Sequence, residues 1–253
     1  MVPNNGVDTF NVQIDNGNAT NSSVSLDTNA TIDNLTIDAL DSLGINNVRI
    51  LTVISGAGAG TITNAGSIAL NSIASVTDLR VSGGNVNLTG GGTVTMSNFT
   101  NNRIHGVVST NRLTNQAGHT IQGAGQIGAN AMALTNQGTI NANQTNSLTI
   151  DLSSPGINDG TFKASSGGTL IVNDDISGTG NWLADAGTVT LSSGVDVTTT
   201  GNIDILNGGS LNLTNATMTG NNLNMSGAGS SISVNSTVEL AGNLLYSITN
   251  EGK

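Results

Sequence analysis

Gly167-Gly168-Thr169-Leu170-Ile171-Val172 is the first of four similar stretches in the second half of the chain. The other three are Gly187-Thr188-Val189-Thr190-Leu191, Gly208-Gly209-Ser210-Leu211-Asn212-Leu213 and Gly229-Ser230-Ser231-Ile232-Ser233-Val234. The equivalent glycines stand at positions 168, 187, 209 and 229, which gives a period of roughly 20 residues. Such a period is typical of a solenoid, in which each repeat forms one turn that cannot bury its apolar side alone.

Within each copy, apolar residues alternate with small polar ones, as in Leu211-Asn212-Leu213. This alternation predicts a short strand with one buried side. Gly, Asn and Ser close each run, and they let the chain change direction without a long loop. Because parallel crossovers are overwhelmingly right-handed, we expect an all-β fold, a right-handed parallel β-helix (β-solenoid) with turns of about 19–23 residues.

The pattern predicts a single β-solenoid over residues 1–253. We expect an N-terminal cap at 1–26, turns over 27–237, and a last turn or second cap at 238–253. At this period the rod has about 12 turns and a length on the order of 55 Å. The most apolar run, at 48–54, is rich in β-branched residues and precedes a Gly-Ala segment, so a strand is predicted there.

A second repeat contains asparagine followed closely by glycine. Asn115, Asn136 and Asn158 follow one another at close to the same period as the glycines, and Asn64 lies in a similar context. Asparagine tolerates left-handed backbone conformations, and its amide can bond to neighbouring backbone. We therefore interpret these residues as structural, at equivalent corners of successive turns.

The composition excludes several classes of protein. Only 9% of the residues are charged and 2% aromatic, with 34 Gly and no Cys. The 36% of hydrophobic residues are regularly spaced, which argues against disorder. A net charge of −10 argues against binding to nucleic acid or to an anionic membrane surface.

No segment has the 18 or more apolar residues expected of a membrane span, so no membrane insertion is predicted. The first residues contain neither a charged nor an apolar region of the kind found in signal peptides. Either the chain is cut from a longer, exported precursor or the protein stays inside the cell, and we favour the first.

Two motifs resemble known sites but lack the necessary context. Gly123, Gly125 and Gly128 match a dinucleotide fingerprint, yet no helix pattern or acidic partner follows. His105 and His119 have no Cys or Glu nearby, and their spacing is not a metal-binding pattern. We expect both histidines to lie at the surface or at a corner.

Two groups of aspartates are the candidates for chemistry. Carboxylates stacked on one side of a β-helix could cleave polysaccharides, and turn-length spacings relate some aspartates of the second half. Those near the N-terminus could bind calcium, although their spacing matches no EF-hand loop. The first group is Asp151, Asp174, Asp175, Asp185, Asp196 and Asp204, and the second is Asp8, Asp15, Asp27, Asp33, Asp38 and Asp41. Sugar clefts usually need aromatic platforms, and Trp182 and Tyr246 are far apart in the sequence.

Thr-x-Thr pairs, which some ice-binding solenoids present in every turn, occur at 61/63, 93/95, 188/190 and 198/200. Among the four copies at 167–234, only Thr188 and Thr190 form such an outward pair. We therefore do not favour ice binding.

Three stretches carry a resemblance to a known family: Thr9-Phe10-Asn11-Val12-Gln13-Ile14-Asp15-Asn16-Gly17, Leu134-Thr135-Asn136-Gln137-Gly138-Thr139-Ile140 and Gly167-Gly168-Thr169-Leu170. With these stretches the chain resembles large bacterial β-strand-repeat exoproteins, of the autotransporter-passenger-like and PEP-CTERM surface types. It implies export, an extracellular or cell-surface location and frequent adhesion. It carries over no functional residues.

The function expected from the sequence is therefore that of a non-enzymatic structural or adhesin segment forming a stiff rod. The alternative is a carbohydrate-binding or carbohydrate-cleaving β-helix. We assign no catalytic, cofactor-binding or metal-ligating residues and no cofactor, with calcium as the one ion considered. Surface glycans or another surface protein are the expected partners, and the sequence leaves the oligomeric state open.

Overall fold

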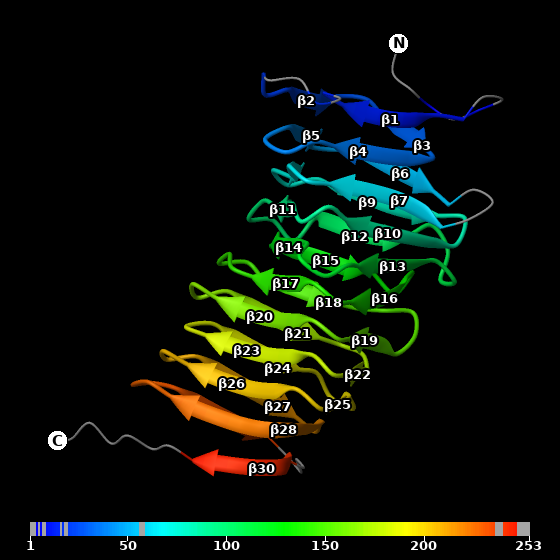
Figure 1. Cartoon of the computed structure of the whole chain (residues 1–253). Coiled ribbons are helices and arrows are strands. Elements are labelled where there is room, and N and C mark those ends of the chain that lie inside the picture. The colour runs from blue at the N-terminus through cyan, green and yellow to red at the C-terminus, as the bar shows by residue number, and fades with distance from the viewer. Residues whose placement is uncertain are drawn as a thin grey trace.

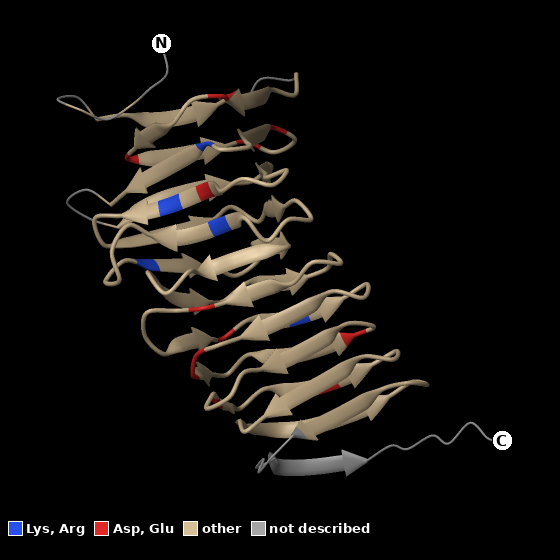
Figure 2. Ribbon diagram, turned by 180° about the vertical axis from the view of Figure 1, so that it is seen from behind, with Lys and Arg blue, Asp and Glu red and all other residues tan. Residues whose placement is uncertain are grey.

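The computed structural model describes residues 9–15, 20–55, 59–235 and 240–246, together with residues 4, 6 and 17; for 235 and 240–246 only the backbone is described. In these residues the chain forms parallel strands stacked into a β-solenoid, seen from opposite sides in Figures 1 and 2. The predicted all-β parallel fold is confirmed. No helix that could cross a membrane is found among the described residues.

Each turn contributes one strand to each of three sheets. The first sheet contains β1 (Asn11–Ile14), β4 (Asn34–Ile37), β7 (Gly60–Asn64), β10 (Asn85–Thr89), β13 (Arg112–Asn115), β16 (Ala133–Asn136), β19 (Gly156–Asn158), β22 (Ile176–Gly178) and β25 (Asp196–Thr199). The second contains β2 (Ser23–Leu26), β5 (Ser42–Asn46), β8 (Ser67–Asn71), β11 (Thr93–Met96), β14 (Thr120–Gly123), β17 (Thr139–Ala142), β20 (Thr161–Ser165), β23 (Asn181–Asp185) and β26 (Asn202–Leu206).

The third sheet contains β3 (Ala30–Ile32), β6 (Ile50–Ile54), β9 (Thr77–Ser82), β12 (Asn102–Gly106), β15 (Gly125–Gly128), β18 (Leu148–Ile150), β21 (Thr169–Val172), β24 (Thr188–Leu191), β27 (Ser210–Thr214) and β29 (Ser231–Asn235). The long strand β28 (Thr217–Ser226) pairs with strands of the first and second sheets and with β30 (Leu240–Tyr246). We number the turns so that β1–β3 form turn 1. The first corner joins the first and second sheets, the second corner joins the second and third, and the third corner leads to the next turn.

The described residues form ten turns rather than the expected 12 or so, as the ten strands of the third sheet indicate. The expected period holds through most of the rod, for example between the paired Val172 and Leu191. Turns in the first half of the rod are longer. Val53 pairs with Val81, Leu79 with Ile104 and Leu88 with Asn115, all at separations above the expected period. Longer corner segments, such as residues 72–76 and 97–101, take up the additional residues.

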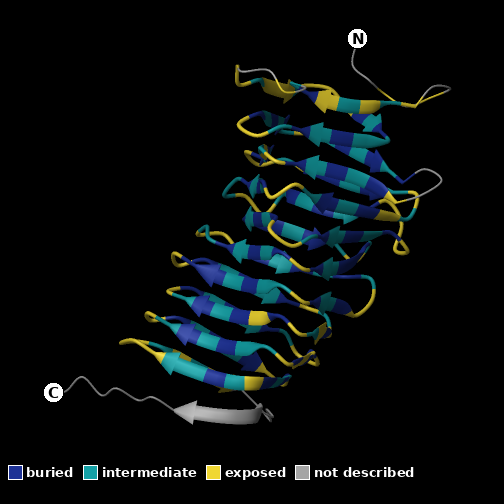
Figure 3. Cartoon of the chain, in the orientation of Figure 1, coloured by how far each residue is buried: buried dark blue, intermediate teal, exposed yellow. Residues whose placement is uncertain are grey.

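The four similar glycine-led stretches between residues 167 and 234 form β21, β24, β27 and β29, which lie side by side in register. Their inward residues continue a ladder of paired aliphatic side chains that fills the interior. In Figure 3, buried residues recur along the strands from turn to turn. One row of this ladder is Leu51, Leu79, Ile104, Ile127, Ile150, Val172, Leu191 and Leu213. All are at most 2% exposed, so each turn buries its apolar side only against its neighbours.

The expected strand at 48–54 and the expected terminal segments can be compared with the structure. The apolar run at 48–54 becomes a strand only from Ile50, because Val48 adopts a left-handed φ of 65° at the second corner and is exposed. In the segment 1–26, β1 and β2 pair in parallel with β4 and β5. Of the segment 238–253, the description covers only the backbone of β30.

In the dinucleotide-like motif, Gly123 and Gly125 flank a sharp corner between β14 and β15, and Gly128 ends β15. Gly123 has a φ of 122°, and a Cβ there would lie 2.0 Å from the Met96 carbonyl oxygen of the preceding turn. The glycines therefore allow the backbones of adjacent turns to pack closely.

Replacing inward Leu211 with Asp places an unpaired charge between Val189 and Ile232. We expect Leu211→Asp to lower the free energy of unfolding by more than about 4 kcal/mol. Asn212→Asp, which adds the same charge on the outward side of the same strand, is the control and should cost less than about 1 kcal/mol. Denaturant unfolding followed by circular dichroism measures both, and equal losses would show that the inward register is misassigned.

Candidate functional site

The most elaborate polar cluster lies on the outer side of the third sheet, around Asp78. Register places Asp78 of β9 beside Arg103 of β12, and Arg80 beside His105. Arg80 donates from Nε and Nη2 to Asp78 Oδ2 at 2.9 and 2.5 Å. Arg103 donates from Nε to Oδ1 at 2.8 Å and from Nη2 to Oδ2 at 2.9 Å. The carboxylate is thus clamped by two guanidinium groups.

The cluster is covered by its own cations. The Asp78 side chain is 0% exposed, whereas those of Arg80 and Arg103 are 30% and 27% exposed. His105 Nδ1 lies 2.9 Å from the Gly106 carbonyl oxygen, and its Nε2 lies 3.4 Å from Asp78 Oδ2, within ion-pair range but without a well-formed hydrogen bond. The side facing solvent is therefore cationic, which suits contact with a carboxylate or another anion.

Two opposing effects act on the pKa of Asp78. Burial raises it, but the neighbouring His105, Arg103 and Arg80 together outweigh burial and hold the pKa well below its usual range. Asp78 therefore stays ionised at all ordinary pH values. This cluster was not predicted from the sequence. The opposite charges one turn apart, at 78 and 103, could have indicated an ion pair between adjacent turns.

The predicted corner asparagines form a buried ladder. Asn115 Nδ2 donates to Asn136 Oδ1 at 2.8 Å, and Asn136 Nδ2 donates to Asn158 Oδ1 at 2.8 Å. All three are at most 1% exposed. The structural interpretation of these residues agrees with this geometry, because each side-chain amide donates a hydrogen bond to the asparagine of the next turn.

His119 extends this network and is buried, contrary to a surface position. Its Nδ1 lies 3.1 Å from Asn115 Oδ1 and its Nε2 lies 3.0 Å from Asn64 Nδ2, two turns away. The intervening turn has Gly90 at that corner, where a Cβ would lie 2.6 Å from Asn64 backbone atoms. The contacts fit a neutral ring that donates from Nδ1 and accepts at Nε2. Burial lowers the pKa of His119 to about 4.

The structure brings only some of the second-half aspartates together. Asp174 and Asp175 line an open pocket of about 360 Å³ at the third corner of turns 5–7, with Asn130, Asn173 and Pro155. Asp174 Oδ2 accepts a hydrogen bond from the Leu152 N–H at 2.5 Å. Burial raises the pKa of Asp174, and the nearby charges of Asp151 and Asp175 act in the same direction.

Of the other aspartates of that group, Asp185 and Asp204 lie apart from this pocket, and Asp196 contacts its lining through its backbone. Asp196 donates its N–H to Asp175 Oδ1 at 2.8 Å from the start of β25. Asp185 and Asp204 belong to β23 and β26 of the second sheet, where Asp185 pairs with Lys163 at 3.2 Å and Asp204 accepts from Asn224. The six residues therefore form no single cleft.

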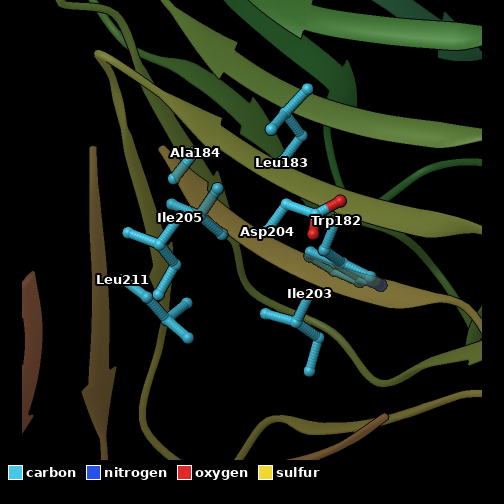
Figure 4. Close-up of a pocket in the computed structure, with 8 residues that line it drawn as sticks. Trp182, Leu183, Ala184, Ile203, Asp204, Ile205 and Leu211 are labelled. Atoms are coloured by element: carbon cyan, nitrogen blue, oxygen red, sulfur yellow. The ribbon is translucent and has the colours of Figure 1, made fainter. Parts of the chain in front are cut away.

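Trp182 provides no platform for a sugar, because it points into the core. It is 1% exposed and packs edge-on against Phe162, with ring centroids 5.0 Å apart. The space beside it amounts to about 10 Å³ and is lined mainly by apolar residues, as the close-up in Figure 4 shows. That is about the size of one water molecule, so it is a packing gap rather than a ligand site. The side chain of Tyr246 falls outside the described residues.

Two of the N-terminal aspartates bind backbone N–H groups through their carboxylates. Asp38 Oδ2 accepts from the Gly17 N–H at 2.6 Å, and Asp41 Oδ1 accepts from the Ser22 N–H at 2.7 Å. Asp27 lines an apolar cavity of about 320 Å³ at the N-terminal end of the core. Asp8 lies outside the described residues, and within them no group of three or more acidic or histidine side chains could hold a metal ion.

Comparison of the chain with protein-family models, with curated proteins and with solved structures found no match. The class established by the structure is therefore a parallel β-solenoid built from repeated turns.

The buried histidine makes stability depend on pH. Because its folded pKa of about 4 lies below the ordinary value of about 6.5, the unfolded chain binds a proton that the folded chain does not between these values. Stability is fully present above about pH 6.5 and decreases by up to about 3 kcal/mol as the pH falls to about 4. Denaturant unfolding across this range measures the effect. His119→Gln, which keeps one donor and one acceptor, should flatten this part of the profile, and an unchanged slope would contradict the assignment.

Removing the charge of Asp78 leaves two guanidinium groups without their partner. We expect Asp78→Asn to lower the free energy of unfolding at pH 7 by about 2 kcal/mol, a value reduced for the partial exposure of both arginines. The difference from wild type should persist above about pH 4 and shrink at lower pH, since this carboxylate stabilises only while ionised. Asp185→Asn, in the partly exposed pair with Lys163, is the control and should cost less than about 1 kcal/mol. Equal losses in urea unfolding would contradict a special role for the cluster.

Proposed function

We propose that the chain is a non-enzymatic, stiff rod segment of an extracellular or cell-surface protein, where it acts as a spacer or adhesin. The observation that carries the proposal is a regular row of small polar residues on the outer side of the second sheet. One row on the second sheet presents a small hydroxyl or amide residue in each of seven successive turns: Ser42, Ser67, Thr93, Thr120, Thr139, Thr161 and Asn181. A row of this kind offers hydration and repeated weak contacts rather than a focused reaction centre.

The interior supports a mechanical role. The aliphatic ladder and the parallel backbone pairing run through all ten turns, so bending the rod would separate side chains that pack against both neighbours. The likeness to bacterial repeat exoproteins, seen in the sequence motifs, supports the exported location. Surface glycans or another surface protein remain the partners proposed for an adhesive role.

The second candidate function, carbohydrate binding or cleavage, is favoured by the pocket at the third corner. There Asp174, whose pKa is raised by burial, lies near the charges of Asp151 and Asp175, and paired carboxylates can act as general acid and base.

A polysaccharide depolymerisation screen and a glycan array, each with and without calcium, separate the two candidates. For a spacer or adhesin we expect no release of reducing ends from any polymer, with or without binding to the array. Asp174→Asn/Asp175→Asn is the matched variant. Depolymerisation that disappears in this variant, while it still unfolds like wild type, would overturn the rod proposal and establish an enzyme.

A further inference from the structure

Charge is segregated along the rod. Residues 42–128, from β5 to β15, contain four of the six Lys and Arg residues and one acidic residue, Asp78. Residues 129–235 contain seven Asp and one basic residue, Lys163. A chain of net charge −10 thus has a basic region of net charge +3 next to an acidic one.

Both charged regions reach the same side of the rod. Arg80 and Arg103 lie on the outer side of the third sheet, and Arg112 follows the third corner of turn 4. Asp151, Asp174 and Asp175 follow β18 and β21, at the third corner of turns 6 and 7. Figure 2 shows both groups in one view, the basic residues on the upper turns and acidic ones along one margin of the lower turns.

Exposed apolar side chains border the basic part of the third sheet along both edges. On one edge, the second corner of turns 2–4 presents Val48, Ile73, Val76 and Phe99, with Ile73 67% exposed. On the other edge, the third corner of turn 4 presents Val107 and Val108, about half exposed. Apolar residues combined with arginine are typical of protein–protein contacts.

We propose that this basic face, comprising Arg80, Arg103, Arg112 and the six bordering apolar residues, binds the acidic corner of a second copy of the chain. The acidic corner comprises Asp151, Asp174 and Asp175. The basic face lies on turns 2–5 and the acidic corner at the ends of turns 6 and 7, so two antiparallel rods related by a two-fold axis near turn 6 bring each basic face onto the partner's acidic corner. Each attractive contact then occurs twice.

The second copy is the partner that the charges favour. It supplies carboxylates at a fixed distance along the rod from the basic face, and a two-fold pair satisfies both copies at once. Among the described side chains, Phe99 is the exposed aromatic one, which offers little surface for stacking on a sugar ring. The proposal concerns self-association alone and holds whether or not the chain is a surface rod.

Sedimentation equilibrium of the whole chain at pH 7 tests the proposal. We expect a dimer at about 0.1 mM protein in low salt that dissociates as salt is raised, because exposed charges are screened. Arg112→Glu and Asp175→Arg should each weaken dimerisation at least about tenfold, since each change removes two contacts. Arg112→Glu/Asp175→Arg, with both charges reversed in one chain, should recover it.

Lys163→Glu is the control, because Lys163 lies on the second sheet, outside both surfaces. It should leave dimerisation unchanged, and circular dichroism should show that all variants fold. A monomer at every salt concentration, or a dimer unaffected by both single reversals, would overturn the proposal. So would a monomer that binds an oligogalacturonate through Arg80 and Arg103, since the face would then serve an anionic glycan.

Discussion

In-register stacking of aliphatic side chains between successive parallel turns is the constraint on which the rest of the structure depends. No turn has a core of its own, so Leu79 or Ile150 is buried only because equivalent residues lie above and below it. A slip of one residue would turn the polar side of a strand inward, and the ladder therefore fixes the register of all three sheets. The corners adjust to that register: Gly209 is required where a Cβ would lie 2.1 Å from the Ala184 carbonyl oxygen.

The ladder also explains where variation is tolerated. Residues at the corners and on the outer side of the sheets do not contribute to it, so insertions and unusual side chains gather there. The long turns carry their additional residues at corners, and the same region of the rod carries the arginines and the exposed apolar residues. The arginines and the exposed apolar residues thus lie on the outside of a regular scaffold, in turns 2–5.

The fold was predictable because period-two alternation and a recurring glycine are local signals that survive in a single sequence. The asparagine ladder at Asn115, Asn136 and Asn158 was predictable for the same reason. The Asp78 cluster was not found, because its members come from two turns of unusual length and the period expected from the glycines does not align them. The separation of Asp185 and Asp204 from the pocket could not be predicted from the sequence either, because spacing by one turn does not reveal which sheet a residue occupies.

His119 changes how the stack holds together. In a solenoid with contacts only between adjacent turns, each turn can be lost from an end in sequence, as in a one-dimensional chain of nearest neighbours. The imidazole reaches from turn 5 past Gly90 to Asn64 in turn 3 and so links turns that are not adjacent. Turns 3–5 then share a buried polar contact that none of them can lose alone. Turn 6 is joined to this group in a similar way, because Asn146 donates from its N–H and its Nδ2 to Asn98 of turn 4. Turns 3–6 should therefore open as one cooperative block, whose amide protons exchange at a common rate, while the turns toward the C-terminus fray one at a time.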